Sequence, residues 1–282
     1  MPIFTRRALP LYLLLLVLFS APFDILLIRA AKIDAVHGFV IHGEMWAPGI
    51  AAILACVLSR TPIAALGWRW PAGRWMAWGY ALPIGYALLA YLILWTTGLA
   101  PLDLAAYAKT STPLGIGPAG AVLAVILTLS YGVVQSAASA TGEEIGWRGL
   151  LAPALAERMS FAAMVAVSGL IWAAWHMPLI LFADYNSGAP WWVAVACFTL
   201  MIVSTGALSA WLRLKSGSFW PAALLHACHN AVIQWVLDPM TVETGRAAWF
   251  AGEFGIVLAL VSTVVAVIVI GRDRVRREHR AV

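Results

Sequence analysis

Long apolar runs, separated by short connections, dominate the hydrophobic pattern of this chain. A helix needs about 20 mainly apolar residues to cross the hydrocarbon core of a bilayer, so runs of this length predict membrane spans. Eight spans are expected, at 9–29, 45–59, 75–98, 119–141, 161–182, 191–212, 219–237 and 249–271. The pattern therefore predicts an all-α, polytopic membrane protein of about eight transmembrane helices.

The first apolar run follows Arg6 and Arg7, as the apolar core of a secretory signal does. It continues past Pro22 and Asp24 to Ile28, which is too long for a typical signal, so we interpret it as the first span. An acidic residue inside a span usually faces the protein interior or reaches the interface. We expect one of these two positions for Asp24.

Composition supports the membrane class and excludes a soluble domain with a large core. The chain is 62% hydrophobic and 11% charged, and such composition in long runs is typical of multispanning proteins. No polar linker or low-complexity tract divides it, so a single membrane domain over residues 1–282 is expected. No internal repeat is evident, which disfavours a transporter. The three cysteines are isolated and form no metal or disulfide pattern.

The distribution of basic residues predicts the orientation of the chain. With the N-terminus inside and eight spans, 14 of the 18 Lys and Arg residues fall in inner segments. The four in outer segments are Arg29, Lys32, Lys109 and Arg246. Cytoplasmic loops carry such an excess of positive charge, so both termini are predicted to be cytoplasmic, in the cell membrane. The net charge of +5 therefore reflects topology, and the lipid bilayer rather than nucleic acid is the expected partner.

A cluster of closely spaced charged residues follows the apolar run that ends at Ala140. Glu143 and Glu144 are adjacent carboxylates, and Arg148 lies four residues after the second. Charges at membrane depth cost from about 3 to more than 10 kcal/mol, so they usually lie in a protein or water cavity and have a function there. If the helix continues, Glu144 and Arg148 share a face and can pair, whereas Glu143 stays available.

Two later spans carry the other polar side chains of interest. Trp172 and His176 are one turn apart in the fifth span, and His226 and Asn230 share one face of the seventh. Unsatisfied polar groups are costly in lipid, so these residues are expected to face a pocket between helices. With the predicted limits of the fourth and fifth spans, Glu143 and His176 lie at different depths in the membrane. A shared site therefore requires shifted helix ends or tilted helices.

The residues alone leave several interpretations open. Glu143, His176 and His226 are acceptable zinc ligands, although no His-Glu-x-x-His helix is present. The same groups could line a proton path, with Asp184 and Asp238 as partners near the outer ends. Each polar residue by itself could be an ordinary helix-to-helix hydrogen bond. A cysteine nucleophile is disfavoured, because Cys228 points away from His226 on a helix.

Together the three motifs resemble the CPBP family of intramembrane proteases, which includes the type II CAAX prenyl endopeptidases. The matching residues are Glu143-Glu144-x-x-x-Arg148, Trp172-x-x-x-His176 and His226-x-x-x-Asn230, within a core of 119–237. Trp172 stands where the family usually has Phe. The resemblance implies an intramembrane endopeptidase that hydrolyses a peptide bond in a membrane-associated or lipid-modified peptide or protein.

The resemblance also implies a role for each residue. Glu143 is the expected general base, and His176 is expected to orient or activate the water. His226 and Asn230 are expected to stabilise the oxyanion, with Glu144, Arg148 and Trp172 in support. No cofactor is implied by this mechanism, with zinc as the alternative. The non-enzymatic alternatives are an immunity or peptide-binding membrane protein and a proton-coupled transporter.

Overall fold

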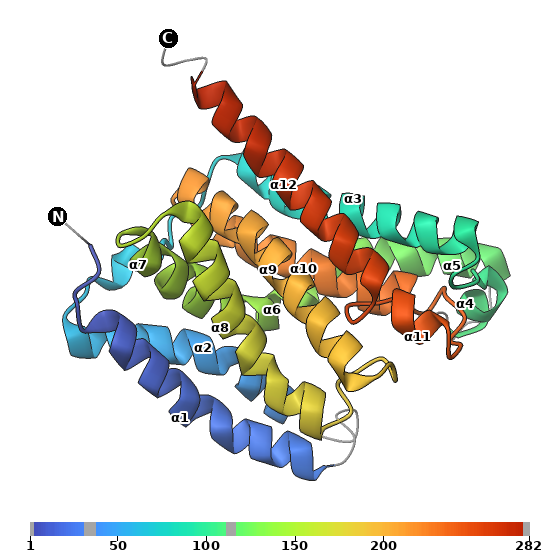
Figure 1. Ribbon diagram of the computed structural model, residues 1–282, viewed down its shortest axis with the longest axis horizontal. Helices are drawn as coiled ribbons and strands as arrows, with labels where there is room; N and C mark the ends of the chain where they lie inside the picture. Colours follow the sequence, from blue (N-terminus) through green and yellow to red (C-terminus); the bar gives the residue numbers. More distant parts are fainter. Residues whose placement is uncertain (1–2, 31–37, 111–116, 279–282) are drawn as a thin grey trace.

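The computed structural model describes residues 3–30, 38–110 and 117–278, which form a bundle of helices (Figure 1). Its helices are α1 (Ala8–Arg29), α2 (Gly38–Ser59), α3 (Gly73–Thr97), α4 (Leu104–Thr110), α5 (Gly117–Leu127), α6 (Val133–Glu144), α7 (Ala152–Ala156), α8 (Phe161–Phe182), α9 (Trp191–Ser216), α10 (Trp220–Val232), α11 (Ala247–Phe250) and α12 (Ile256–Glu278). π-Helical turns cover Thr128–Gly132, Ile145–Leu151 and Ile233–Leu237. The predicted all-α class is confirmed.

Seven helical segments in the described part of the chain are long and apolar enough to cross a membrane. They are Ala8–Arg29, Gly38–Ser59, Gly73–Thr97, Gly117–Ala156, Phe161–Phe182, Trp191–Ser216 and Ile256–Asp273. The chain is therefore a multi-pass membrane protein. The eighth expected span, 219–237, is a continuous helix made of α10 and the π-turn after it, but it is absent from these seven because its polar side chains lower its hydropathy.

The position of α10 explains why it tolerates this polarity. It lies in the middle of the bundle (Figure 1) and packs against α3, α6 and α9. Most of its side chains are buried against these neighbours. A helix enclosed by protein needs no apolar face toward lipid, and polar groups on it can find partners on adjacent helices.

The fourth predicted span, 119–141, was too short. The structure continues it without a break from α5 through α6, the π-turn Ile145–Leu151 and α7, over Gly117–Ala156. Glu143 therefore lies inside a long helix rather than at its end. This extension removes the mismatch in depth with His176, because the polar residues after Ala140 are enclosed by protein and do not end the helix.

Two other predicted boundaries were also wrong. Helix α2 begins at Gly38 rather than at 45, so Glu44 is a helical residue. The last span begins at Ile256 rather than at 249, because a turn precedes it. Gly252 in this turn has φ of 73°, a left-handed conformation that favours glycine.

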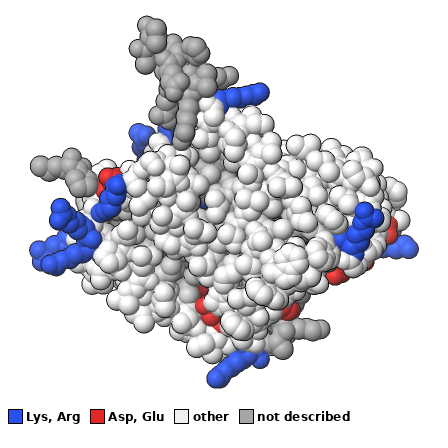
Figure 2. All heavy atoms as spheres, viewed as in Figure 1, with Lys and Arg blue, Asp and Glu red and all other residues white. Residues whose placement is uncertain are grey.

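Basic residues gather at one end of the bundle. The long helices alternate in direction, so α1 begins and α12 ends at this same end (Figure 1). Its basic residues include Arg6, Arg7, Arg60, Arg69, Arg74, Arg158, Lys215 and Arg272. The opposite end carries Arg29, Lys109 and Arg246, and the surface between the ends is mostly uncharged (Figure 2). Lys32 and Arg280, which were also counted in the predicted distribution of basic residues between the two sides of the membrane, lie outside the described residues.

Candidate active site

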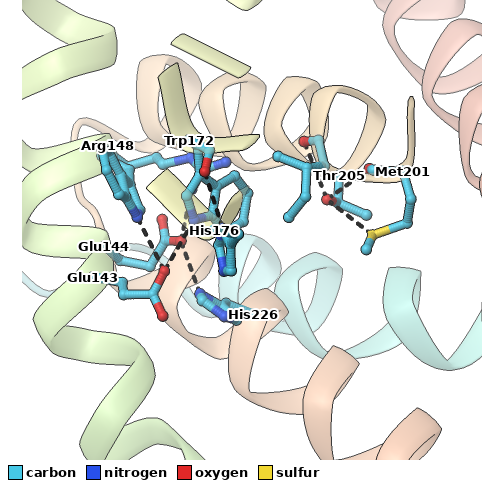
Figure 3. Close-up of polar contacts among 10 residues, drawn as sticks. Glu143, Glu144, Arg148, Trp172, His176, Met201, Thr205 and His226 are labelled. Carbon is cyan, nitrogen blue, oxygen red and sulfur yellow. Dashed lines mark hydrogen bonds and ion pairs between the residues drawn. The ribbon is translucent and has the colours of Figure 1, made fainter. Parts of the chain in front are cut away.

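The three sequence motifs meet at one cavity inside the bundle. α6 and the π-turn after it supply the first motif, α8 the second and α10 the third (Figure 3). The cavity has a volume of about 370 Å³, and its walls include Glu143, His176, His226 and Asn230. It extends to Tyr185, in the connection after α8. The expected catalytic residues are thus brought together, from positions up to 87 residues apart in the sequence.

Two indole groups hold the Glu143 carboxylate in place. Its Oε2 accepts hydrogen bonds from Nε1 of Trp147 at 3.1 Å and from Nε1 of Trp172 at 2.9 Å. The side chain is buried, with 2% of its surface exposed. Because both indoles bind the same oxygen, Oε1 is left to face the cavity that Glu143 lines. The carboxylate is fixed in orientation and keeps one acceptor oxygen for a water or substrate.

Glu144 points the other way and organises two neighbours. Its Oε1 accepts from Nη1 of Arg148 at 2.7 Å and lies 3.1 Å from Nδ1 of His226 (Figure 3). The predicted Glu144–Arg148 pair is present. The Arg148 guanidinium also lies over the ring of Trp172, 4.2 Å from its centroid. Glu144 is fully buried, so this network links the first motif to the other two without contact with solvent.

The two motif histidines have opposite hydrogen-bonding characters. Nδ1 of His176 is 2.9 Å from the carbonyl oxygen of Trp172. A carbonyl only accepts, so this nitrogen carries the proton, and Nε2 of neutral His176 is an acceptor. Rings of Trp175 and Phe198 pack edge-on at 4.7 and 5.0 Å and fix the imidazole plane.

His226 differs because its Nδ1 faces a carboxylate. A carboxylate accepts, so Nδ1 of His226 donates to Glu144, and Nε2 is a donor as well when the imidazole is protonated. Asn230, one turn later on α10, lines the cavity and is half-buried, and its amide makes no hydrogen bond to the described residues. The site thus combines an acceptor at His176 with donors at His226 and Asn230.

His229 belongs to a different network. Its Nδ1 is 2.6 Å from the hydroxyl of Tyr86, and its Nε2 is 3.1 Å from Oε1 of Glu253. Glu253 also accepts from Gln234 and Tyr185. Burial raises the pKa of Glu253, but these hydrogen bonds and the facing His229 outweigh burial and hold the pKa below its ordinary value. Both ring nitrogens of His229 are therefore engaged, Nδ1 with α3 and Nε2 with the turn before α12.

Cys228 points away from the cavity, as expected from its position on the helix. It is buried in a small apolar cluster, and its Sγ lies 3.5 Å from the backbone oxygen of Tyr80 on α3. No group of three or more His, Cys, Asp or Glu side chains among residues 3–30, 38–110 and 117–278 is arranged to hold a metal ion. Whether Glu143, His176 and His226 bind zinc stays a prediction.

Sequence reasoning missed part of the site. It gave Trp172 only a supporting role, whereas the indole nitrogen of Trp172 donates directly to Glu143. It also missed Trp147, although the spacing of four residues from Glu143 places both on one helix face. Glu44 of α2 and Glu253 line the cavity as well. Neither had a sequence signal, because both fell at the edge of a predicted span.

The arrangement supplies the groups that amide hydrolysis requires. Glu143 and Nε2 of His176 are two acceptors that can hold and deprotonate a water molecule. His226 and Asn230 can donate to a developing oxyanion from the facing helix. The apolar part of the surrounding wall is aliphatic and aromatic, and low polarity near the site strengthens these electrostatic interactions.

Comparisons with known proteins agree with the motifs. Residues 118–232 match the family model described as type II CAAX prenyl endopeptidase Rce1-like. The chain is also 30% identical over 117 residues to CAAX prenyl protease 2 of Methanococcus maripaludis. That alignment covers 38% of this chain and 42% of the curated relative, so the chain spans less than half of the relative's length. The resemblance predicted from the three motifs is confirmed: residues 118–232 are similar to the Rce1-like family of type II CAAX prenyl endopeptidases.

Proposed function

We propose that this protein is an intramembrane endopeptidase that hydrolyses a peptide bond with a water activated by Glu143. The observation that carries the proposal is the orientation of that carboxylate. Two indole donors occupy Oε2, so the remaining oxygen faces the cavity beside His176 and opposite His226. A buried acid held in this way is a positioned base rather than a salt-bridge partner.

The chemical steps follow from the placement of the donors and acceptors. Glu143 accepts a proton from the bound water, whose second hydrogen points to Nε2 of His176. The water oxygen forms a bond to the carbonyl carbon, and the carbonyl electrons move to the oxygen. His226 and Asn230 donate hydrogen bonds to this oxyanion. The C–N bond then breaks, and the proton held by Glu143 passes to the leaving amine.

The substrate is a peptide segment at or within the membrane. The cavity wall is largely apolar, which suits a hydrophobic or lipid-modified segment. The curated relative is named a prenyl protease, so a prenylated C-terminal peptide is one candidate, and an unmodified membrane peptide is the other. Glu144 and Arg148 take no part in proton transfer and act by holding His226 and Trp172.

A screen for cleavage tests the proposal. The purified protein in lipid vesicles is mixed with a pool of membrane-associated peptides, half of them carrying a prenyl group, and products are identified by mass spectrometry. We expect cleavage at a defined bond, which persists after a strong chelator is added. Activity that is lost on chelation and restored by zinc would contradict water activation by Glu143 alone. Absence of cleavage, with retained peptide binding, would favour a non-catalytic binding protein.

A further inference from the structure

A third carboxylate, which the proposed reaction does not use, reaches the same cavity from α2. Glu44 lines the cavity together with Glu143 and has 4% of its surface exposed. Neither of its carboxylate oxygens has a hydrogen-bond partner in the described protein. The Ser20 hydroxyl lies close enough to stabilise the Glu44 carboxylate, and its oxygen accepts from Nε1 of Trp175. A buried acid without a partner is costly and points to a ligand that supplies one.

Close packing of α2 on α6 fixes the position of Glu44 relative to Glu143. A Cβ on Gly142 would lie 2.8 Å from the backbone oxygen of Met45, so the two helices touch through their backbones here. Two hydrogen bonds reinforce this contact. Nδ1 of His42 is 2.6 Å from Oγ of Ser139, and Nε1 of Trp46 donates to the carbonyl of Ala138 at 3.0 Å. The segment that carries Glu44 is therefore rigidly held beside the site.

The charges around Glu44 favour a cation. The ionisable groups that act on it are Asp24 of α1 and Glu143, both acidic. Among the described residues, the carboxylates of Glu44, Glu143, Asp184 and Glu253 and the imidazoles of His176, His226 and His229 line the cavity, and no described lysine or arginine does. Like charges in an apolar cavity repel, and a positively charged group beside Glu44 in the cavity would relieve this repulsion.

We propose that Glu44 is a specificity residue that binds the lysine or arginine side chain of a peptide substrate close to the bond that is cleaved. This inference rests on the proposed function, because the cation is brought into the cavity by the peptide that the water activated by Glu143 attacks. The long aliphatic stem of either side chain suits the apolar wall, and its charged head reaches the carboxylate. A charged hydrogen bond formed only with a basic side chain gives selectivity against neutral peptides of the same size.

The test is a substitution scan of one cleaved peptide. Each of the three residues on either side of the cleaved bond is replaced in turn by lysine or by norleucine, which has a similar length and no charge. At one position we expect the wild type to cleave the lysine peptide with a kcat/KM at least about tenfold above that of the norleucine peptide. Glu44→Gln, which keeps the shape, should bring this ratio close to one, mainly through KM.

A matched control separates a local effect from a general change of charge. Glu243 is exposed at the same end of the molecule and does not line the cavity, so Glu243→Gln should retain the full lysine preference. No lysine preference in the wild type, or an unchanged preference in Glu44→Gln, would overturn the proposal. So would an equal loss of kcat/KM for both peptides in Glu44→Gln, because that result indicates a structural role.

A binding measurement distinguishes this inference from the proposed function. Leucine-rich membrane peptides with one central lysine or norleucine are titrated onto Glu143→Gln and onto the double variant Glu143→Gln/Glu44→Gln. Tighter binding of the lysine peptide that is lost in the double variant supports the Glu44 site even if the wild type cleaves nothing. Equal binding of both peptides to both variants contradicts it, whether or not cleavage is observed.

Discussion

At the scale of single residues, the geometry of the site is set by which atom of each side chain already makes a hydrogen bond within the protein. Glu143 uses one oxygen for two indoles, His176 uses one nitrogen for a backbone carbonyl, and His226 uses one nitrogen for Glu144. Each contact leaves the opposite atom for the cavity. Orientation by such supporting hydrogen bonds is a general requirement of active sites, since misplacement by about 1 Å reduces rates strongly.

The hydrogen bond from Trp172 to Glu143 leads to a direct prediction. Trp172→Phe preserves an aromatic ring and removes the indole donor, so Glu143 keeps Trp147 as its remaining anchor. We expect kcat to fall about ten- to hundredfold, because one hydrogen bond to a charged carboxylate, worth roughly 1.5–3 kcal/mol, is lost. Melting of the purified variant should change little. An unchanged kcat would contradict a positioning role for the indole nitrogen.

The third motif allows neighbouring residues to be compared. His226→Ala and Asn230→Ala should each lower kcat by about 10² to 10³, the usual cost of one oxyanion donor. His229→Ala should cost far less turnover, because both nitrogens of His229 are bound to Tyr86 and Glu253. It should instead lower the melting temperature, since Glu253 loses a buried partner. An inactive His229→Ala beside an active His226→Ala would reject this assignment.

The candidate residues were predictable where type and spacing coincided. Glu144 and Arg148 were expected to pair from their spacing of four, and they do. Trp172 could not be recognised as a donor to Glu143, because that contact joins two helices 29 residues apart. Glu44 lacked any signal for the same reason, since its role depends on which helix packs beside it.

At the scale of helices, contact between α2 and α6 sets the geometry of the site. A Cβ on Gly49 would lie 2.5 Å from the backbone oxygen of Gly142, the residue before Glu143. Small residues permit such close approach between membrane helices. The apolar pattern predicted most helices, but it set several ends wrongly. An apolar run stops at the first polar residues, whereas the helix continues through them when protein encloses their side chains.

This contact is tested by a pair of glycine substitutions. Gly49→Ala should lower the melting temperature by several degrees and reduce turnover, because the added methyl meets backbone that cannot move aside, at a cost of about 1–3 kcal/mol. Gly85→Ala on α3 is the control, since its Cβ would have no neighbour within 4 Å. It should be neutral or slightly stabilising. Equal effects of the two changes would contradict close packing at Gly49.

At the scale of the whole molecule, the alternating helices bring the start of α1 and the end of α12 to one end (Figure 1). The basic residues gathered there favour the cytoplasmic side. Apolar runs predicted eight crossings, and seven helical segments of the described chain are long and apolar enough to cross a membrane. The segment that does not qualify contains α10, a helix mostly buried against its neighbours.

Reporter fusions test this orientation. We expect a reporter placed after Glu278 to be active in the cytoplasm, and one inserted between α8 and α9 to be exposed on the outer side. Both predictions follow from the excess of Lys and Arg at the end where α12 finishes. A cytoplasmic reporter in the connection between α8 and α9 would reverse the proposed orientation.

The central claim is that Glu143 activates the water. The direct measurement is kcat for one cleaved peptide with the wild type and with Glu143→Gln, alongside peptide affinity and thermal melting of both proteins. The substitution keeps the shape and removes the proton acceptor, so kcat should fall at least about 10³-fold while affinity and melting temperature stay close to those of the wild type. Retention of more than a tenth of the wild-type kcat by Glu143→Gln would contradict the proposed mechanism.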